Sequence, residues 1–437
     1  MQASLKKITG EVVISGDIPA LIEKEVKTIA DFQSKLNFFL KTSVTELLEF
    51  ILSSAVSFAV SDVHIEPEKE RAKMRFRIDG MLRDVAAFNQ KEYLTILSRI
   101  KLLSGLKLNI ADRPQDGRFS IILKKQAIEV RVSTLPAEYG EAVVARILDP
   151  KGFVEMETLG LREDLLNLLN REIKRPHGMI IVTGPTGSGK TTTLYAILKK
   201  IKKAEVKIIT IEDPIEYHLE GISQTQVAPE KGYDFASGLK SIVRQDPDAI
   251  LVGEIRDLET ANIALQAALT GHLVLATLHT NDAAGALARL QALGEKAVNI
   301  APAINIAIAQ RLVRRVCEQC VGTTEAGPEI IKIFSEELKK LPTGVLLPKI
   351  GSPLSVPTIK GCKACDFTGY KGRVGIFEAF LINDETEKFI LTKPSISELK
   401  ERAIKNGMVT MRQDGLIKVL EKITTIEEVD RVMGENE

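Results

Sequence analysis

The stretch from Gly184 to Thr191, "GPTGSGKT", limits the possible fold more than any other part of this chain. It matches the pattern G-x-x-x-x-G-K-[ST], follows the apolar run "MIIVTG" and opens the helix-like run "KTTTLYAILKKI". A strand, a glycine-rich loop and a helix in this order form a phosphate-binding loop, in which backbone N–H groups and a helix N-terminus face the phosphates. Lys190 is expected to contact the β- and γ-phosphates, and the Thr191 hydroxyl to bind magnesium. The expected nucleotide-binding residues are Gly184, Pro185, Thr186, Gly187, Ser188, Gly189, Lys190, Thr191 and Thr192.

The residues after Gly178 alternate between short apolar runs and helix-like runs. The apolar runs "MIIVTG", "VKIITIED", "AILVGE" and "LVLATLHT" are strand candidates, and amphipathic segments separate most of them. This alternation predicts an α/β fold with a parallel, doubly wound sheet. Ligands of such sheets bind beyond the carboxyl ends of the strands, where the polar clusters of this sequence fall.

Two acidic clusters follow strand candidates. Glu212, Asp213 and Glu216 lie in "TIEDPIEY", and Glu254 ends "AILVGE", where Gly253 occupies the position at which an aspartate is usually expected. Nucleotide hydrolysis needs one carboxylate near magnesium and another near the attacking water. We expect Glu254 to hold magnesium through its water shell. Spacing alone does not assign the other roles, but the turn forced by the Asp–Pro pair favours Glu216 as the general base, with Glu212 as the alternative.

Two histidines and three arginines are further candidates. His272 and His279 flank the strand candidate "LVLAT", and seven residues of strand put them about 23 Å apart, too far for one metal ion. His279 follows the strand and is placed to sense the γ-phosphate, whereas packing or exposure explains His272 equally well. Arg113, Arg118 and Arg131 precede the nucleotide domain. Because nucleotide hydrolysis needs cations on the transferred phosphoryl group, we expect these arginines to act across a domain or subunit boundary.

Four cysteines form two C-x-x-C pairs separated by 41 residues, Cys317 with Cys320 and Cys362 with Cys365. Two such pairs can supply a tetrahedral thiolate set for zinc. A redox role fits poorly, because neither pair begins a helix after a strand. Since all four ligands come from the protein, we expect this zinc to be structural.

The composition is that of a folded protein with several domains. The net charge is +1, aromatic residues make up 5% and tryptophan is absent, which argues against a nucleic-acid-coating function. The apolar run "LLEFILSSAVSFAV" is interrupted by Glu49 and is too short to span a bilayer, and no signal peptide is recognisable, so we expect a cytoplasmic protein. The expected divisions are an N-terminal arm (1–42), a small α+β domain (43–150), a linker and helix (151–170), the nucleotide domain (171–316), a tetracysteine region (317–368) and a mainly helical C-terminal part (369–437).

From about Ser43 onward the chain resembles the secretion ATPase superfamily, specifically the type II secretion and type IV pilus assembly (extension) ATPases. The resemblance rests on "SDVHIEP", "RPQDGR", "VRVSTLP", "GPTGSGKTTTLY", "TIEDPIEY", "RQDPDAILVGEIRD", "TGHLVLATLHTNDA", both cysteine pairs, "TGYKGRVGIFE" and "TMRQDGLIKV". It implies a RecA-like ATPase domain, a PAS-like small domain, a zinc-binding insertion and a helical C-terminal part. Members of this family commonly have glycine at the position before this glutamate, as here at Gly253. Retraction members of the superfamily lack the four cysteines, so the chain resembles an extension or export motor.

The resemblance also implies a function. Family members form hexameric rings that hydrolyse ATP with Mg²⁺ at the cytoplasmic face of the inner membrane. They drive assembly of pilin-like subunits into a filament and act with an inner-membrane platform protein. By the family pattern Glu216 is the base, Glu254 serves magnesium, and His272 and His279 form a histidine box. The first-domain arginines complete the site. Many members carry further N-terminal domains, whereas about 42 residues precede the small domain here.

Three classes of function remain: an assembly or secretion motor, a motor that translocates nucleic acid, and a nucleotide-binding scaffold. Within the first class, the motifs do not separate type IV pilus assembly, DNA-uptake pili and type II secretion. A ring motor that translocates nucleic acid would share the sheet and the phosphate-binding loop, but the near-neutral charge and scarce aromatic residues disfavour it, and no nucleic-acid partner is expected. A scaffold that binds nucleotide without hydrolysing it is the weakest of the three.

Overall fold

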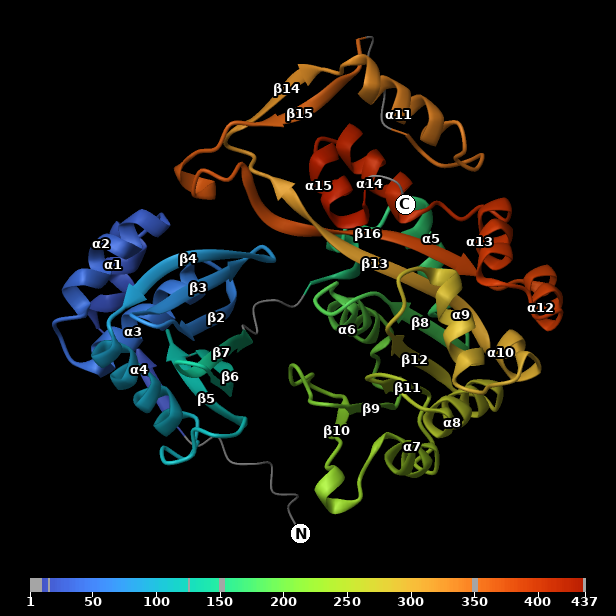
Figure 1. Ribbon diagram of the computed structural model, residues 1–437. Coiled ribbons are helices and arrows are strands. Elements are labelled where there is room, and N and C mark those ends of the chain that lie inside the picture. The colour runs from blue at the N-terminus through green and yellow to red at the C-terminus, as the bar shows by residue number, and fades with distance from the viewer. Residues whose placement is uncertain (1–9, 15, 125, 149–153, 348–352, 435–437) are drawn as a thin grey trace. The chain divides into compact units, whose positions relative to one another are not determined.

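A computed structural model of the chain describes residues 10–14, 16–124, 126–148, 154–347 and 353–434 (Figure 1). The chain divides into two compact units. Unit 1 comprises Met1–Gly152, Cys317–Cys320 and Ile359–Lys371, and unit 2 comprises Phe153–Val316, Val321–Thr358 and Gly372–Glu437. The expected domain end near Pro150 and the first residues of the expected linker lie outside the described residues.

Unit 1 is built on a seven-stranded sheet with strand order β1-β5-β6-β7-β2-β3-β4. All of its described pairings are antiparallel except that between β1 and β5. The elements are β1 (Glu11–Ile14), α1 (Asp17–Glu25), α2 (Ile29–Phe39), α3 (Val44–Ser57), β2 (Val60–Pro67), β3 (Ala72–Ile78), β4 (Met81–Phe88), α4 (Gln90–Leu103), β5 (Gln115–Leu123), β6 (Gln126–Ala137) and β7 (Gly140–Leu148). The short helix η4 (Lys363–Cys365) contains Cys365, and Cys362 is its N-cap.

The first 42 residues, expected to form a poorly specified arm or a small helical piece, contain ordered elements that pack on the rest of unit 1. Strand β1 extends the sheet beside β5, and Thr28 caps α2 through a capping box. Phe32 of α2 stacks on Phe50 of α3 at 5.3 Å between ring centroids, and Phe39 stacks on the same ring at 4.3 Å. Because these aromatic rings are buried against α3, α2 belongs to the core of unit 1.

Unit 2 is built on a second seven-stranded sheet, with strand order β10-β9-β11-β12-β8-β13-β16. Its first elements are η2 (Met156–Thr158), α5 (Glu163–Glu172), β8 (Gly178–Thr183), α6 (Lys190–Ile201), β9 (Ile208–Glu212), β10 (Ser223–Gln226), η3 (Pro229–Lys231), α7 (Phe235–Val243), β11 (Ala249–Val252), α8 (Leu258–Leu269) and β12 (Leu273–Leu278). The remaining elements are α9 (Ala283–Ala292), α10 (Ala297–Ala303), β13 (Ile304–Val316), β14 (Val321–Glu325), α11 (Pro328–Leu338), β15 (Ser355–Ile359), β16 (Tyr370–Leu381), α12 (Asp384–Leu391), α13 (Ile396–Lys405), α14 (Met411–Leu420) and α15 (Ile426–Met433).

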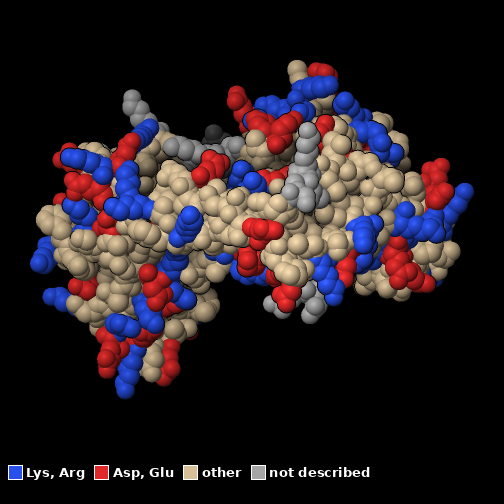
Figure 2. Space-filling view, turned by 90° about the horizontal axis from the view of Figure 1, so that it is seen from above, with Lys and Arg blue, Asp and Glu red and all other residues tan. Residues whose placement is uncertain are grey.

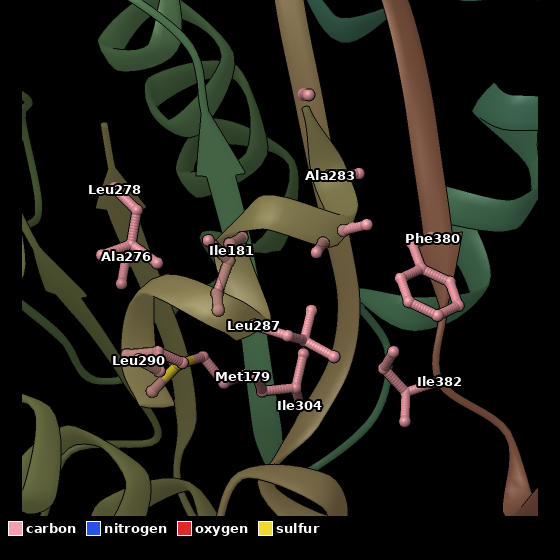
Figure 3. Packing of buried hydrophobic residues seen from close by; sticks show 14 of the residues in the cluster. Met179, Ile181, Ala276, Leu278, Ala283, Leu287, Leu290, Ile304, Phe380 and Ile382 are labelled. Carbon is pink, nitrogen blue, oxygen red and sulfur yellow. The ribbon is translucent and has the colours of Figure 1, made fainter. Parts of the chain in front are cut away.

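Strands β10, β9, β11, β12, β8 and β13 run parallel, as the alternation of strands and helices predicted. Side chains of β8 alternate between two cores, because neighbouring residues of a strand point to opposite faces. Met179 and Ile181 face α9, where they meet Leu287 and Leu290 (Figure 3). Ile180 packs on the opposite face with residues of α5 and α6. Helices therefore cover both faces, and the predicted α/β fold class is confirmed.

Residues 370–381, placed by the sequence analysis at the start of a mainly helical part, form strand β16 instead. This strand is the neighbour of β13 at the edge of the sheet in unit 2. Phe380 and Ile382 join the core of that sheet beside Ile304 of β13 (Figure 3). Helices α12 to α15 then follow in sequence. No helix in the described part of the chain is long and apolar enough to cross a membrane.

Candidate functional site

The phosphate-binding loop connects β8 to α6 and needs glycine at two positions. Gly184 has φ +144°, and a Cβ atom there would lie 2.5 Å from Gln310 O and 2.7 Å from Ser188 Oγ. Gly189 is the N-cap of α6 with φ +89°. Since side chains at such φ values are strained, and Gly184 also has no room for one, both glycines of the motif are required by the backbone.

Gln310 of β13 holds this loop from the neighbouring strand. Its Nε2 donates to Ser188 O at 2.6 Å, and its Oε1 accepts from Thr193 Oγ1 of α6 at 2.7 Å. Gln310 is 1% exposed, and its only sequence signal is a polar side chain in the apolar run "INIAIAQ". Within the described residues the buried Ser188 Oγ finds no hydrogen-bond partner, which suits a loop that receives phosphate oxygens.

Lys190 and Thr191 are the first two residues of α6. Lys190 Nζ donates to Gly184 O at 2.9 Å and to Pro185 O at 3.1 Å, so the ammonium lies over its own loop. Burial lowers the pKa of Lys190, and the nearby Glu254 carboxylate opposes this shift. An anionic phosphate would add a second favourable partner for this ammonium.

Charged side chains cluster around Glu254 at the carboxyl ends of β11 and β12. Arg256 Nη2 pairs with Glu254 Oε1, and His279 Nε2 lies 3.6 Å from Glu254 Oε2. Arg256 also reaches Asp213 after β9, at 3.6 Å. Burial, followed by the cations Lys190 and Arg256, lowers the pKa of His279. Sequence reasoning missed Arg256, although it lies two residues after Glu254 in "GEIRD".

Gly253 is explained by a close approach of two backbones. A Cβ atom at this position would lie 3.2 Å from Glu212 Cα and 3.2 Å from Ile211 O, both on the neighbouring strand β9. Contacts this short would push β9 away from β11. A side chain at 253 would therefore require β9 to shift by a few tenths of an ångström, whereas the acid of this strand comes one residue later, at Glu254.

The two candidate bases differ in exposure. Glu212 ends β9 and is 3% exposed, whereas Glu216 is half-buried in the segment between β9 and β10. Burial raises the pKa of Glu212, and hydrogen bonds to its carboxylate oppose that shift. Which of the two activates water stays a prediction at this point.

The two histidines lie at opposite ends of β12. His279 follows Leu278, which pairs with Thr183 just before the phosphate-binding loop. His272 precedes the strand, its carbonyl accepts from Gly178 N at 3.2 Å, and its ring Nδ1 lies 3.0 Å from Ala267 O. Within unit 2 the structure thus brings His279, but not His272, to the phosphate-binding edge.

In unit 1, two of the three candidate arginines belong to a row of cross-strand neighbours. Arg118 of β5 is opposite Arg131 of β6, which is opposite Arg146 of β7. Directly opposed residues of antiparallel strands present their side chains on one face. The Glu129 carboxylate lies 3.8 Å from Arg118 Nη1 and 3.4 Å from Arg131 Nε. Arg113 lies before β5 and is exposed, so it is not part of this row.

The row continues beyond the arginines that the sequence singled out. Asp62 of β2 is opposite both Arg146 of β7 and Arg77 of β3. Its carboxylate accepts from Arg146 Nε at 2.8 Å and lies 3.5 Å from Arg77 Nε. Arg77 and Arg146 were missed, because nothing local in "MRFRID" or "VARILD" shows that the strands align.

The four cysteines converge as predicted. Their Sγ atoms all lie within 4.8 Å of one another, with Cys317 to Cys362 at 3.9 Å and Cys320 to Cys365 at 3.7 Å. A tetrahedral site with zinc–sulfur bonds of about 2.3 Å separates its sulfurs by about 3.8 Å, so the donor set fits zinc. Burial opposes ionisation of Cys365, but N–H groups of Cys362 and Gly369 donate to its Sγ and lower its pKa to about 7.

The cysteine loop is also tied to the first helices of unit 1. Asp366, one residue after Cys365, accepts from Ile29 N at 3.0 Å and pairs with Arg83 of β4. The tetracysteine segment therefore contacts residues more than 280 positions earlier in the chain. Spacing could predict the metal ligands, but not this contact.

Comparison with known proteins places this arrangement in a family. A family model described as "Type II/IV secretion system protein" matches residues 40–431. The chain belongs to this family. Type II secretion system protein E of Xanthomonas campestris pv. campestris is 43% identical over 428 residues, which cover 97% of this chain and 72% of that protein. Type II secretion system ATPase E of Vibrio cholerae is 43% identical over 396 residues, which cover 90% of this chain and 76% of that protein.

Solved structures agree with the fold of this type II/IV secretion system protein. The Legionella pneumophila ATPase DotB superposes with a TM-score of 0.63 at 20% identity, over 88% of this chain and 95% of that chain. The pilus retraction motor PilT with bound ADP superposes with a TM-score of 0.56 at 25% identity, over 87% of this chain and 95% of that chain. The predicted secretion ATPase fold is confirmed, and the chain is an ATPase of this family.

Proposed function

We propose that this ATPase is the motor that powers assembly of pilin-like subunits into a type II secretion pseudopilus or a type IV pilus. One observation carries the proposal: 43% identity across 97% of the chain to a type II secretion system protein E, with an intact phosphate-binding loop. Type II secretion is the more specific reading, because the relatives named above carry that description.

The residues around the phosphate-binding loop suit ATP hydrolysis. Magnesium, when bound with ATP, would neutralise charge on the β- and γ-phosphates, and Thr191 and Glu254 are the residues proposed to hold it. Lys190 would leave its own loop carbonyls to contact the phosphates. The Glu216 carboxylate would accept a proton from the attacking water. His279 lies beside Glu254 and would sense the γ-phosphate.

In this proposal the arginines of unit 1 complete the site. Arg113, Arg118 and Arg131 belong to unit 1, whereas the phosphate-binding loop belongs to unit 2. We propose that they reach the phosphates across a domain or subunit boundary in a homo-hexamer, the sixfold number coming from the family. The tetracysteine cluster would hold a structural zinc ion.

The proposed place of action is the cytoplasmic face of the inner membrane, reached through an inner-membrane platform protein. Nucleic acid is not an expected partner. The face seen in Figure 2 carries lysine and arginine interspersed with aspartate and glutamate and shows no continuous basic tract, which a nucleic-acid groove would need.

The catalytic assignment is tested by Glu216→Gln and Glu212→Gln in otherwise unchanged protein. Glu216→Gln should bind ATP and assemble normally but lose about 10²- to 10⁴-fold in turnover, the usual contribution of a general base. Glu212→Gln keeps the shape of a buried side chain and should lower turnover far less than Glu216→Gln. Loss of hydrolysis in Glu212→Gln together with normal turnover in Glu216→Gln would reverse the assignment.

The cellular role is tested with purified partners. ATP turnover should rise on addition of the cytoplasmic part of the platform protein in lipid vesicles, and should be indifferent to single- or double-stranded DNA. Stimulation by DNA alone would favour a nucleic-acid motor. Absence of phosphate release under every condition, with ATP bound, would favour a non-hydrolysing scaffold.

A further inference from the structure

The hydroxyl of Tyr195 lies where strand β9 ends and the acidic segment begins. Tyr195 belongs to α6, the helix opened by the phosphate-binding loop, and is 3% exposed. Its hydroxyl donates to Glu212 Oε2, and its ring lies edge-on to that of Tyr217, with the ring centroids 6.3 Å apart.

Glu212 anchors this hydroxyl from the strand side. Its Oε1 accepts from Thr210 Oγ1 at 2.6 Å and from Gln224 Nε2 at 3.2 Å, while its Oε2 accepts from Tyr195. A buried carboxylate with partners on both oxygens would have to give up those bonds to reach a water molecule. The geometry therefore makes Glu212 an anchor and leaves base chemistry to the more exposed Glu216.

Gln224 of β10 ties down the other end of the same segment. Its Oε1 accepts from Leu219 N at 2.6 Å, and its Nε2 donates to Tyr217 O at 3.0 Å as well as to Glu212. The segment after β9 is thus held at two points. Tyr195 of α6 binds Glu212 at its start, and Gln224 of β10 links Glu212 to the backbone of Tyr217 and Leu219.

We propose that Tyr195 is a positioning residue for ATP hydrolysis, whose hydroxyl, through Glu212 and Gln224, holds the segment that carries Glu216 and so sets where the Glu216 carboxylate meets the attacking water. This inference rests on the proposed role of Glu216 as the base. Because Tyr195 and the phosphate-contacting Lys190 share α6, one rigid helix connects the phosphate-binding loop to the segment that carries the base. A change in the position of α6 would then move both.

Tyr195→Phe is the direct test, because it removes only the hydroxyl and keeps the buried ring beside Tyr217. We expect kcat to fall about 10- to 100-fold, since displacement of a catalytic group by about 1 Å can cost about 10² in rate. The dissociation constant for ATP should stay within about twofold, because the phosphate contacts are untouched. If the Tyr195 hydroxyl only stabilises the fold, Tyr195→Phe would lower the melting temperature and leave kcat unchanged.

The matched control is Tyr233→Phe. Its hydroxyl lies 2.9 Å from Thr225 Oγ1 of β10, so this change removes one tyrosine hydroxyl beside the same strand without touching Glu212. Its kcat should equal that of the parent. Gln224→Met is a second variant, which removes the link through Gln224 and should lower kcat in the same way even if Tyr195→Phe folds poorly.

The decisive measurement combines Tyr195→Phe with Glu216→Gln. A residue that acts through Glu216 adds nothing once the base is gone, so the double variant should turn over ATP as slowly as Glu216→Gln alone. Multiplicative losses, or a Tyr195→Phe kcat within twofold of the parent, would overturn the proposal. Failure of the base assignment is seen separately, as normal turnover in Glu216→Gln by itself.

Discussion

A buried ion pair in unit 1 should hold in place the loop that carries Arg113. Lys101 of α4 is 1% exposed and Glu141 of β7 is 5% exposed. Lys101 Nζ lies 2.8 Å from both carboxylate oxygens and donates to Ile110 O at 2.6 Å, three residues before Arg113. Tyr93 OH adds a hydrogen bond to Glu141 O at 2.9 Å. The pair therefore connects α4, β7 and the arginine-bearing loop.

Replacing one residue of the Lys101–Glu141 pair should strongly destabilise unit 1, whereas replacing both should not. Lys101→Met leaves the Glu141 carboxylate buried without its cation, for which we expect a loss of about 3–5 kcal/mol. Exchange of the pair for apolar residues, Lys101→Met with Glu141→Leu, removes the uncompensated charge and should bring stability to within about 1 kcal/mol of the parent. The second substitution is thus expected to rescue the first.

Urea-dependent hydrogen exchange of the β5, β6 and β7 amides is the suitable assay. A chain of two compact units does not give one well-defined global transition, whereas exchange reports the opening free energy of this sheet itself. A loss below about 1 kcal/mol in Lys101→Met would refute the reasoning, since even one unsatisfied buried polar group costs about that much. A double variant that is destabilised by the sum of the single changes would refute it equally.

Three further predictions concern the cysteines, the arginines and pH. Protein purified without chelator should contain about one zinc ion per chain by metal analysis, and Cys362→Ser should lose it and destabilise the tetracysteine segment while ATP still binds. Arg118→Ala or Arg131→Ala should lower kcat far more than ATP affinity in steady-state and binding assays, because such arginines act on the transition state. Burial alone would raise the pKa of Glu428, but its arginine partners at 2.6 and 2.7 Å hold that pKa below its ordinary value. The stabilisation from Glu428 is therefore complete above about pH 4.3 and is lost as pH falls through its lowered pKa. The opening free energy of unit 2, measured against pH by hydrogen exchange of its sheet amides, should therefore fall less steeply in acid for Glu428→Gln.

The features that the sequence predicted correctly are local ones. The phosphate-binding loop needs only a strand, glycines and a helix in order, and β8, the loop and α6 follow one another as expected. The parallel sheet follows from alternation, and the cysteine cluster from two C-x-x-C pairs. In each case residues within about 15 positions carry the information, or a ligand type with strict geometry does.

The features that the sequence did not reveal depend on pairing between distant segments. Strand β16 reads as part of a helical tail until β13 is seen beside it. Arg77 and Arg146 become neighbours of Asp62 only through the register of three strands. The anchor contacts of Tyr195 and Gln310 join a helix or loop to strands far along the chain. Register and tertiary contact are set by the whole core, which no local pattern contains.

Gly253 shows how such a distant contact shapes the chemistry. Sequence reasoning could note that an aspartate is replaced by glycine, but not why. In the structure β9 approaches β11 so closely that even a methyl group at 253 would meet its backbone at 3.2 Å. The residue brought to 3.2 Å is Glu212, the anchor proposed for the segment that carries Glu216. A side chain at 253 would therefore require β9 to shift by a few tenths of an ångström at Glu212 itself. In the proposed site, glycine at 253 thus leaves the anchor on β9 undisturbed, while Glu254, one residue beyond the close approach, is the acid proposed to serve magnesium.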